Sequence, residues 1–188
     1  GPEFRDPGKR WVGVSGRLRV LVRASHGVSA ASMPKSLKEL AGPAYKGKLG
    51  WAPGNASMHA HVSVLRHLWG EADTEAWLKG MMANEAKAYP KNSPQVRAAA
   101  DGAIALGWVN HYYLHKLRAN DPSLKAANHS LTAGDAGNLM MLSGVGITAH
   151  TDQVAQAEKL VAFLLSDEAQ TYFAKKVYEY PVRSAIAR

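Results

Sequence analysis

Residues 104–113 read Ile-Ala-Leu-Gly-Trp-Val-Asn-His-Tyr-Tyr, an apolar stretch that runs directly into two adjacent tyrosines. The part from Ile104 to Val109 is short and apolar, which is typical of a strand buried on both faces. In open α/β sheets, ligands bind beyond the carboxyl ends of such strands. The stretch therefore predicts a buried strand that delivers Tyr112 and Tyr113 to a ligand-binding crevice.

Two phenol side chains at the end of a strand favour a hard metal ion. Fe(III) is small and highly charged, so it prefers anionic oxygen ligands, and a tyrosinate supplies one. Neighbouring residues on a regular strand point to opposite faces, so both rings reach one ion only if the backbone leaves the strand here. The helical pattern of residues 114–118 is compatible with that. Taken alone, a Tyr-Tyr pair is more often a packing feature.

Two further segments precede predicted helices and are candidates for holding an anion. Asn55, Ala56 and Ser57 come before a helical run, and Asn92, within Lys91-Asn92-Ser93-Pro94, comes before another. Backbone N–H groups at the start of a helix attract oxyanions. Ordinary capping, by Asn55 and by Ser93 ahead of Pro94, would explain the same residues without a ligand. Combined with the tyrosines, these segments describe one crevice for a metal and its counter-anion.

The remaining pattern alternates strands and helices, which gives an α/β fold class. Strands are expected at residues 11–15, 18–22, 49–52, 104–109, 139–142 and 144–148. Helices are expected at residues 34–41, 58–69, 75–82, 93–102, 114–118 and 152–165, and again from residue 166. Loops are expected at residues 26–32 and 120–137, and the second of these is a candidate for a change of sheet or domain.

Composition excludes several classes of protein. The 188 residues include no cysteine, which removes disulfides and thiolate chemistry, and no apolar run approaches the ~20 residues of a membrane span. The net charge of +8 comes from Lys and Arg spread along the chain, so we expect a basic surface and no nucleic-acid site. No nucleophile and base can be paired, so we expect no enzyme.

The histidines do not form a convincing metal site in the sequence. His59 and His61 are two residues apart, a spacing that puts side chains on different faces of a helix. We interpret them and His67 as solvated or core histidines. His111 and His115 are four residues apart and could share a helical face.

The chain resembles the ferric-ion-binding proteins of ABC-type iron transporters, which are two-lobed periplasmic binding proteins. The segments that carry the resemblance are residues 11–17, 34–37, 45–50, 89–93, 110–113, 163–164 and 179–182. The resemblance implies a periplasmic-binding-protein-like (class II) lobe, with a mixed sheet flanked by helices, in a truncated chain. It also implies a periplasmic or extracellular, lipid-anchored mature form that delivers Fe(III) to a membrane ABC permease.

The resemblance also implies roles for individual residues. Tyr112 and Tyr113 are then the metal ligands, with phosphate or carbonate as a synergistic anion. The candidates for contacting this anion are Asn55, Ala56, Ser57, Asn92, Asn110 and, more weakly, Arg17. Ala56 and Ser57 depart from the family, which has Gly and often Ala at these positions, so the anion pocket can differ in detail.

Residues 1–4, Gly-Pro-Glu-Phe, are interpreted as a cloning scar. For the rest of the chain, the resemblance implies that residues 5–144 are mainly the carboxy-terminal lobe with a crossover strand, and that residues 145–188 are a remnant of the amino-terminal lobe. Family members supply further ligands, commonly His and Glu, from an amino-terminal lobe that precedes this chain. We therefore expect an open half-site and, through the exposed lobe face, a homodimer. The alternatives are a same-fold receptor for an oxyanion or polyamine, and a basic interaction module.

Overall fold

The computed structural model describes residues 2–25 and 32–186, so most of the loop predicted at residues 26–32 lies outside the described residues. The chain divides into two compact units. Unit 1 comprises Gly1–Arg17 and Met140–Arg188, and unit 2 comprises Leu18–Leu139. The long strand β1 (Val12–Ala24) contributes residues to both units.

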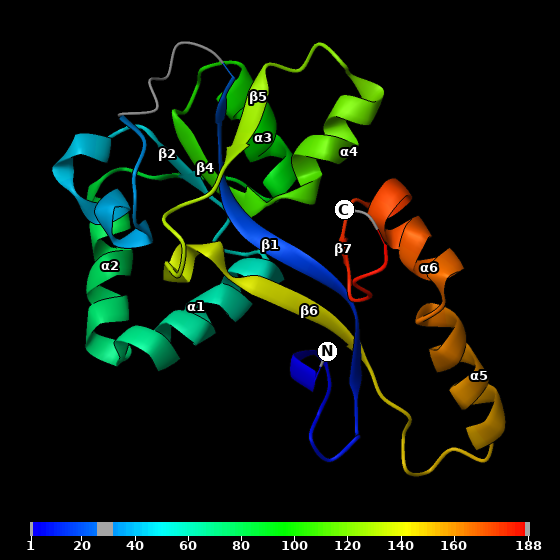
Figure 1. The fold of residues 1–188 in the computed structure, drawn as a ribbon. Helices are drawn as coiled ribbons and strands as arrows, with labels where there is room; N and C mark the ends of the chain where they lie inside the picture. The colour runs from blue at the N-terminus through cyan, green and yellow to red at the C-terminus, as the bar shows by residue number, and fades with distance from the viewer. Residues whose placement is uncertain (1, 26–31, 187–188) are drawn as a thin grey trace. The chain divides into compact units, whose positions relative to one another are not determined.

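Unit 2 is built on a mixed sheet with the strand order β3-β2-β4-β1-β5. Figure 1 labels four of these strands, β2, β4, β1 and β5. β2 (Leu49–Trp51) runs parallel to both β3 (Lys87–Ala88) and β4 (Leu106–Asn110). β1 runs antiparallel to β4 and to β5 (Ala126–His129). The expected α/β class with a mixed sheet is confirmed.

Helices cover both faces of this sheet, which explains why successive side chains on its central strands are buried. The helical elements of unit 2 are η3 (Leu37–Ala41), η4 (Pro43–Tyr45), α1 (Ala56–Trp69), α2 (Glu71–Ala83), α3 (Asn92–Ala100), α4 (Tyr112–Asn120) and η5 (Ala136–Asn138). On β1, Leu21 packs in one core cluster with side chains of η3, α1 and α2. Its neighbours Val20 and Val22 pack in a second cluster with side chains of α3 and α4. The alternation follows the two-residue period of a strand.

Several boundaries differ from the sequence prediction. The segments at residues 11–15 and 18–22, expected to form one or two strands, are a single strand, Val12–Ala24. The predicted loop at residues 120–137 was wrong in part, because it contains β5 and overlaps the start of η5. β5 reads Ala-Ala-Asn-His, which has little strand propensity, and it is a strand because it pairs with β1.

Two predicted helix starts were also misplaced. η3 begins after Ser36, whose side chain accepts a hydrogen bond from Lys38 N, so Pro34 precedes the helix. α3 has Lys91 at its N-cap position, so Ser93 lies in the first turn instead of capping the helix. The prediction of Ser93 as the N-cap was therefore wrong. Pro94 is tolerated because N–H groups of the first turn need no partner within the helix.

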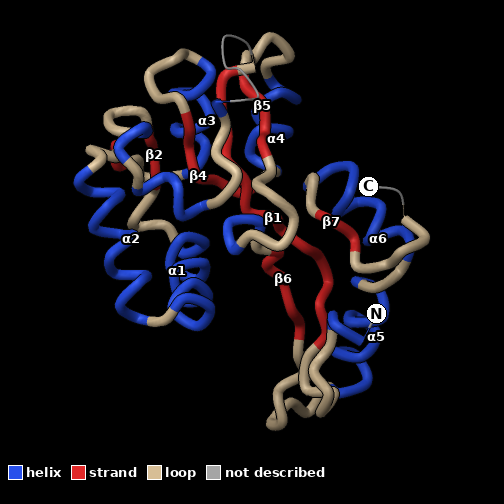
Figure 2. The backbone as a smooth tube through the Cα atoms, turned by 60° about the vertical axis from the view of Figure 1, so that its left-hand side comes forward, coloured by secondary structure: helices blue, strands red, loops and turns tan. Residues whose placement is uncertain are grey.

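Unit 1 consists of β1 residues, β6 (Met140–Val145), α5 (Val154–Leu164), α6 (Asp167–Tyr172) and β7 (Tyr180–Pro181), as Figure 2 shows. It also contains the short turn η1 (Pro2–Phe4) and the π-helical turn η6 (Phe173–Val177). Gln170 is fully buried and donates to Val14 O at 2.7 Å and Leu164 O at 2.9 Å, while its Oε1 accepts from Val182 N at 2.8 Å. One side chain therefore joins strand β1, the end of α5 and the chain after β7.

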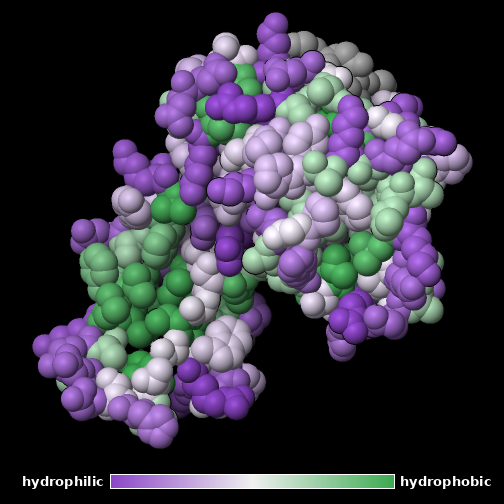
Figure 3. Space-filling model, turned by 180° about the vertical axis from the view of Figure 1, so that it is seen from behind, coloured by the Kyte–Doolittle hydropathy of each residue, from purple (hydrophilic) through white to green (hydrophobic). Residues whose placement is uncertain are grey.

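The helices of unit 1 expose a large apolar surface. No residue of α5 is buried, although its expected apolar face includes Val154 and Leu160. Phe163 and Tyr172 are also about half exposed, and apolar side chains gather over α5 and α6 in Figure 3. Exposed apolar surface of this extent often marks an interaction site. None of the helices in the described part of the chain has the length and apolar character that a membrane span needs.

Candidate metal centre

The two tyrosines lie where β4 passes into α4. β4 ends at Asn110 and α4 begins at Tyr112, so the backbone leaves the strand at the point that the sequence required. The ring centroids of Tyr112 and Tyr113 are 4.5 Å apart, and their planes are inclined by 32°. Asn110 Nδ2 lies 3.4 Å from Tyr112 Oη and donates to it. Successive residues at the start of a helix thus place two phenol rings side by side.

A buried arginine, which sequence reasoning missed, connects this strand end with the start of α1. Arg19 is only 1% exposed, and its Nη1 donates to Asn110 Oδ1 at 3.0 Å and to Ser57 Oγ at 3.4 Å. Its Nη2 donates to Trp108 O at 3.0 Å, and its guanidinium lies 4.7 Å from the Trp108 ring centroid. The sequence did contain a signal for it. Arg19 lies two positions before Leu21, so both point to the same buried face of the strand, where a charged residue needs hydrogen-bond partners.

The charge of Arg19 is coupled to the tyrosine pair. Burial lowers the pKa of Arg19 to about 9, because the charged form loses its hydration. Negative charge on Tyr112 and Tyr113 raises this pKa in return, so their phenolate forms favour the guanidinium cation. The site therefore has a fixed positive group behind its oxygen donors.

The start of α1 is both capped and connected to this network. Asn55 Oδ1 accepts hydrogen bonds from Ser57 N at 3.0 Å and from Ser57 Oγ at 2.6 Å. Asn55 is thus the N-cap of α1, which confirms the capping interpretation of this residue. Ser57 also accepts from Arg19, whereas Ala56 is exposed at the first helical position. Asn55 and Ser57 are linked through Arg19 to Asn110.

The start of α3 contains a buried donor without a partner. Asn92 is 1% exposed, and no hydrogen bond is made by its Nδ2. Its Oδ1 is 3.5 Å from Gln95 Nε2, and no side chain caps the helix at Lys91. Leaving a buried N–H group unpaired costs about 1–3 kcal/mol. An oxygen atom of a ligand would satisfy this group, which fits the expectation of an anion contact.

The histidines lie as the sequence interpretation described. His59 and His67 are exposed and His61 is buried, with Nε2 2.6 Å from Ala136 O. The rings of His111 and His115 are 6.3 Å apart, which confirms that they share a face. Among the described residues, no group of three or more His, Cys, Asp or Glu side chains could hold a metal ion. The paired hydroxyls of Tyr112 and Tyr113 are the candidate oxygen donors of this unit.

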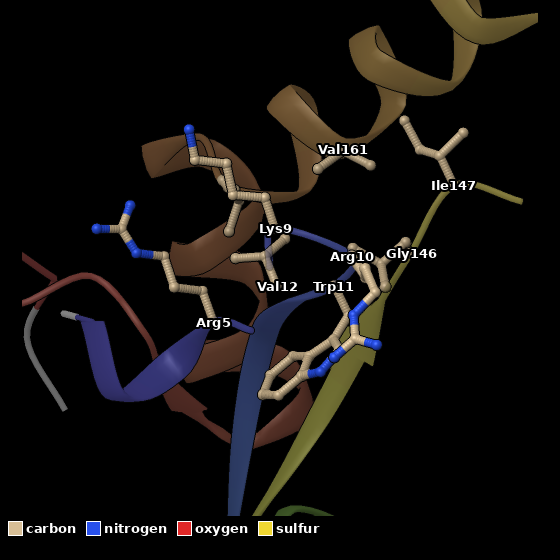
Figure 4. Close-up of a pocket in the computed structure, with 10 residues that line it drawn as sticks. Arg5, Lys9, Arg10, Trp11, Val12, Gly146, Ile147 and Val161 are labelled. Atoms are coloured by element: carbon tan, nitrogen blue, oxygen red, sulfur yellow. The ribbon is translucent and has the colours of Figure 1, made fainter. Parts of the chain in front are cut away.

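Arg17, the weaker candidate for an anion contact, lies in unit 1. It is the last residue of the first segment of unit 1, so its role as an anion contact stays a prediction. Unit 1 has a separate pocket of about 360 Å³, which Figure 4 shows between Trp11, Gly146 and Val161. None of the predicted site residues lines this pocket.

Comparisons with known proteins agree with the resemblance read from the sequence. The chain is 32% identical to the Fe(3+)-binding periplasmic protein of Serratia marcescens, over 96% of this chain and 54% of that protein. It is 33% identical to the major ferric iron-binding protein of Neisseria meningitidis, over 93% of this chain and 53% of that protein. The chain spans about half the length of the curated relatives it matches.

Solved structures give the same result for the fold. Iron-bound HitA from Pseudomonas aeruginosa superposes with a TM-score of 0.91 at 28% identity, over 99% of this chain and 60% of that chain. A Trichodesmium protein in complex with iron and citrate gives a TM-score of 0.88 at 28% identity, over 98% of this chain and 60% of that chain. These neighbours are binding proteins, in line with the expectation of no enzymatic activity. Residues 2–187 match the family model, and the chain belongs to the bacterial extracellular solute-binding proteins.

Proposed function

We propose that this chain is part of an Fe(III) receptor in which Tyr112 and Tyr113 coordinate the ion as phenolates. The observation that most supports this function is the 4.5 Å separation of their rings at the end of a buried strand. Hard trivalent cations favour anionic oxygen donors, and both rings offer one. The iron-binding names of the similar proteins point the same way.

We further propose that phosphate or carbonate completes the coordination. The free Nδ2 of Asn92, the start of α1 at Asn55–Ser57 and the Nδ2 group of Asn110 are suitable donors, with Arg19 as nearby positive charge. Arg17 is a further candidate. Citrate, which accompanies iron in the Trichodesmium structure, is a third anion to be compared in the experiment.

The organisation of the whole receptor is also a proposal. Unit 2 would be most of the carboxy-terminal lobe, and unit 1 part of the amino-terminal lobe, of a periplasmic protein that passes iron to a membrane ABC permease. The exposed apolar side chains of α5 and α6 support self-association of this chain through unit 1. Sedimentation over a range of concentrations tests this association, and a monomer throughout would contradict it.

Titration of Fe(III) into the protein with phosphate, carbonate or citrate tests the metal site. We expect a visible phenolate-to-iron charge-transfer band, which the double variant Y112F/Y113F loses. Tyr45→Phe is the matched control, because Tyr45 lies in η4 of the same unit, outside the site. N92A should lower the affinity for iron when the anion is present. A smaller loss of affinity without the anion would indicate that Asn92 contacts the anion.

Two results would favour other functions. Tight binding of an oxyanion or a polyamine without iron, measured by calorimetry, would indicate a receptor of the same fold for another ligand. A wild-type protein that gives no band with any of the three anions would contradict the iron site. Steeply salt-dependent binding to DNA would instead support a basic interaction module.

A further inference from the structure

Lys116 lies one helical turn after Tyr112 on α4, and its ammonium group sits over the tyrosine ring. The distance from Lys116 Nζ to the ring centroid is 4.7 Å. Residues four apart share one face of a helix, so the geometry of α4 brings the two side chains together. Tyr112 is buried, with 8% of the residue exposed, whereas Lys116 is exposed to water.

We propose that Lys116 is a positioning residue that makes the two tyrosinates unequal ligands, an inference that rests on the proposed function. A cation over an aromatic face is attracted to the ring, and the attraction grows when the ring carries negative charge. In the described part of the chain, Tyr112 has this contact and no cation lies over the ring of Tyr113. Tyr112 is therefore the weaker electron donor of the pair.

This arrangement has a spectroscopic consequence. Charge transfer moves an electron from a phenolate to Fe(III), so stabilising the phenolate electrons raises the energy of the transition. Lys116 should therefore hold the Tyr112 contribution to the band at shorter wavelength. The same positive charge disfavours Fe(III) relative to Fe(II), because the ferric ion carries the larger like charge.

Three single variants separate charge from packing. Lys116→Met keeps the aliphatic chain and removes the charge, while Lys116→Arg keeps a cation in place. Lys125→Met is the matched control, because Lys125 lies far from the site. Its backbone O accepts from Ser25 N, and Ser25 is six residues after Arg19 along the extended chain of β1. Six strand residues span about 20 Å, which is beyond the ~8 Å Debye length at physiological salt.

With Fe(III) and phosphate bound, we expect K116M to shift the band to longer wavelength and the reduction midpoint to lower potential. K116R and K125M should keep the wild-type band and midpoint. In a Y112F background, K116M should shift the remaining band less than it shifts the wild-type band, whereas in a Y113F background its shift should be larger. If K116M acted by changing the stability of α4, its effect on the band would be the same in both backgrounds.

The outcomes distinguish this inference from the proposed function. A wild-type band that K116M leaves unmoved would overturn the role of Lys116 and leave the iron site intact. An equal shift in the Y112F and Y113F backgrounds would also overturn it. Absence of a band in the wild-type protein would overturn both. Circular dichroism of K116M should match that of wild type, since the side chain is exposed.

Discussion

Arg19 and Asn110 are direct partners in the antiparallel ladder of β1 and β4, and Arg19 Nη1 donates to Asn110 Oδ1 at 3.0 Å. The strand pairing and the side-chain bond therefore hold the same two residues in register. Asn110 Nδ2 in turn donates to Tyr112 Oη. The orientation of a proposed metal ligand thus depends on a cation buried in the neighbouring strand.

Replacing Arg19 by Met should destabilise unit 2 by about 3 kcal/mol, because Asn110 Oδ1 and Trp108 O lose a charged donor while they stay buried. Urea unfolding followed by circular dichroism measures the change. Arg66→Met is the control, since Arg66 pairs with Glu71 on the exposed surface, where we expect a change below ~1 kcal/mol. Equal stability of the two variants would show that the Arg19 bonds contribute nothing net.

Replacing His61 by Gln should weaken the dependence of stability on acid. Burial, and next the charge of Arg19, lowers the pKa of His61 from 6.5 to about 3. Below pH 6.5 the unfolded chain binds a proton that the folded chain does not, so the free energy of unfolding falls as the pH falls towards 3. His61 alone contributes up to ~1.4 kcal/mol per pH unit to the slope of the free energy of unfolding against pH. Above the pKa of the unfolded chain it contributes no slope.

The measurement is a series of urea unfolding curves between pH 7 and pH 4. H61Q retains a donor for Ala136 O but cannot titrate, so its curve against pH should be flatter than that of wild type. His67→Gln, on the exposed side of the same helix, should retain the wild-type slope. Identical slopes in wild type and H61Q would argue against a neutral, buried His61.

Replacing Gln170 by Leu should loosen unit 1 at the end of the chain. The change removes the hydrogen-bond donor of Val14 O and Leu164 O and the acceptor of Val182 N, which we expect to cost about 2 kcal/mol. Hydrogen exchange of the Val182 amide should accelerate, because its acceptor is Gln170 Oε1. Gln153→Leu, at an exposed position before α5, is the control. Unchanged protection of Val182 in Q170L would contradict the prediction.

The sequence by itself determined the strand that ends at Asn110 and the helix that follows it. Short-range pattern was sufficient there, because an apolar run bounded by polar residues has few alternatives to a buried strand. It also determined the α/β class and the candidate oxygen donors Tyr112 and Tyr113. The weak pattern of Ala126–His129 was insufficient, and β5 exists because β1 offers it an edge to pair with.

Only the tertiary structure decided which polar groups surround those tyrosines. Arg19 precedes Tyr112 by more than ninety positions in the chain, and Asn92 was identified in the sequence without any sign that its Nδ2 would be buried and unpaired. A sequence pattern shows which side chains leave water. It does not show which distant donor or acceptor meets them, because that depends on strand register and helix packing, which bring remote residues within hydrogen-bonding distance.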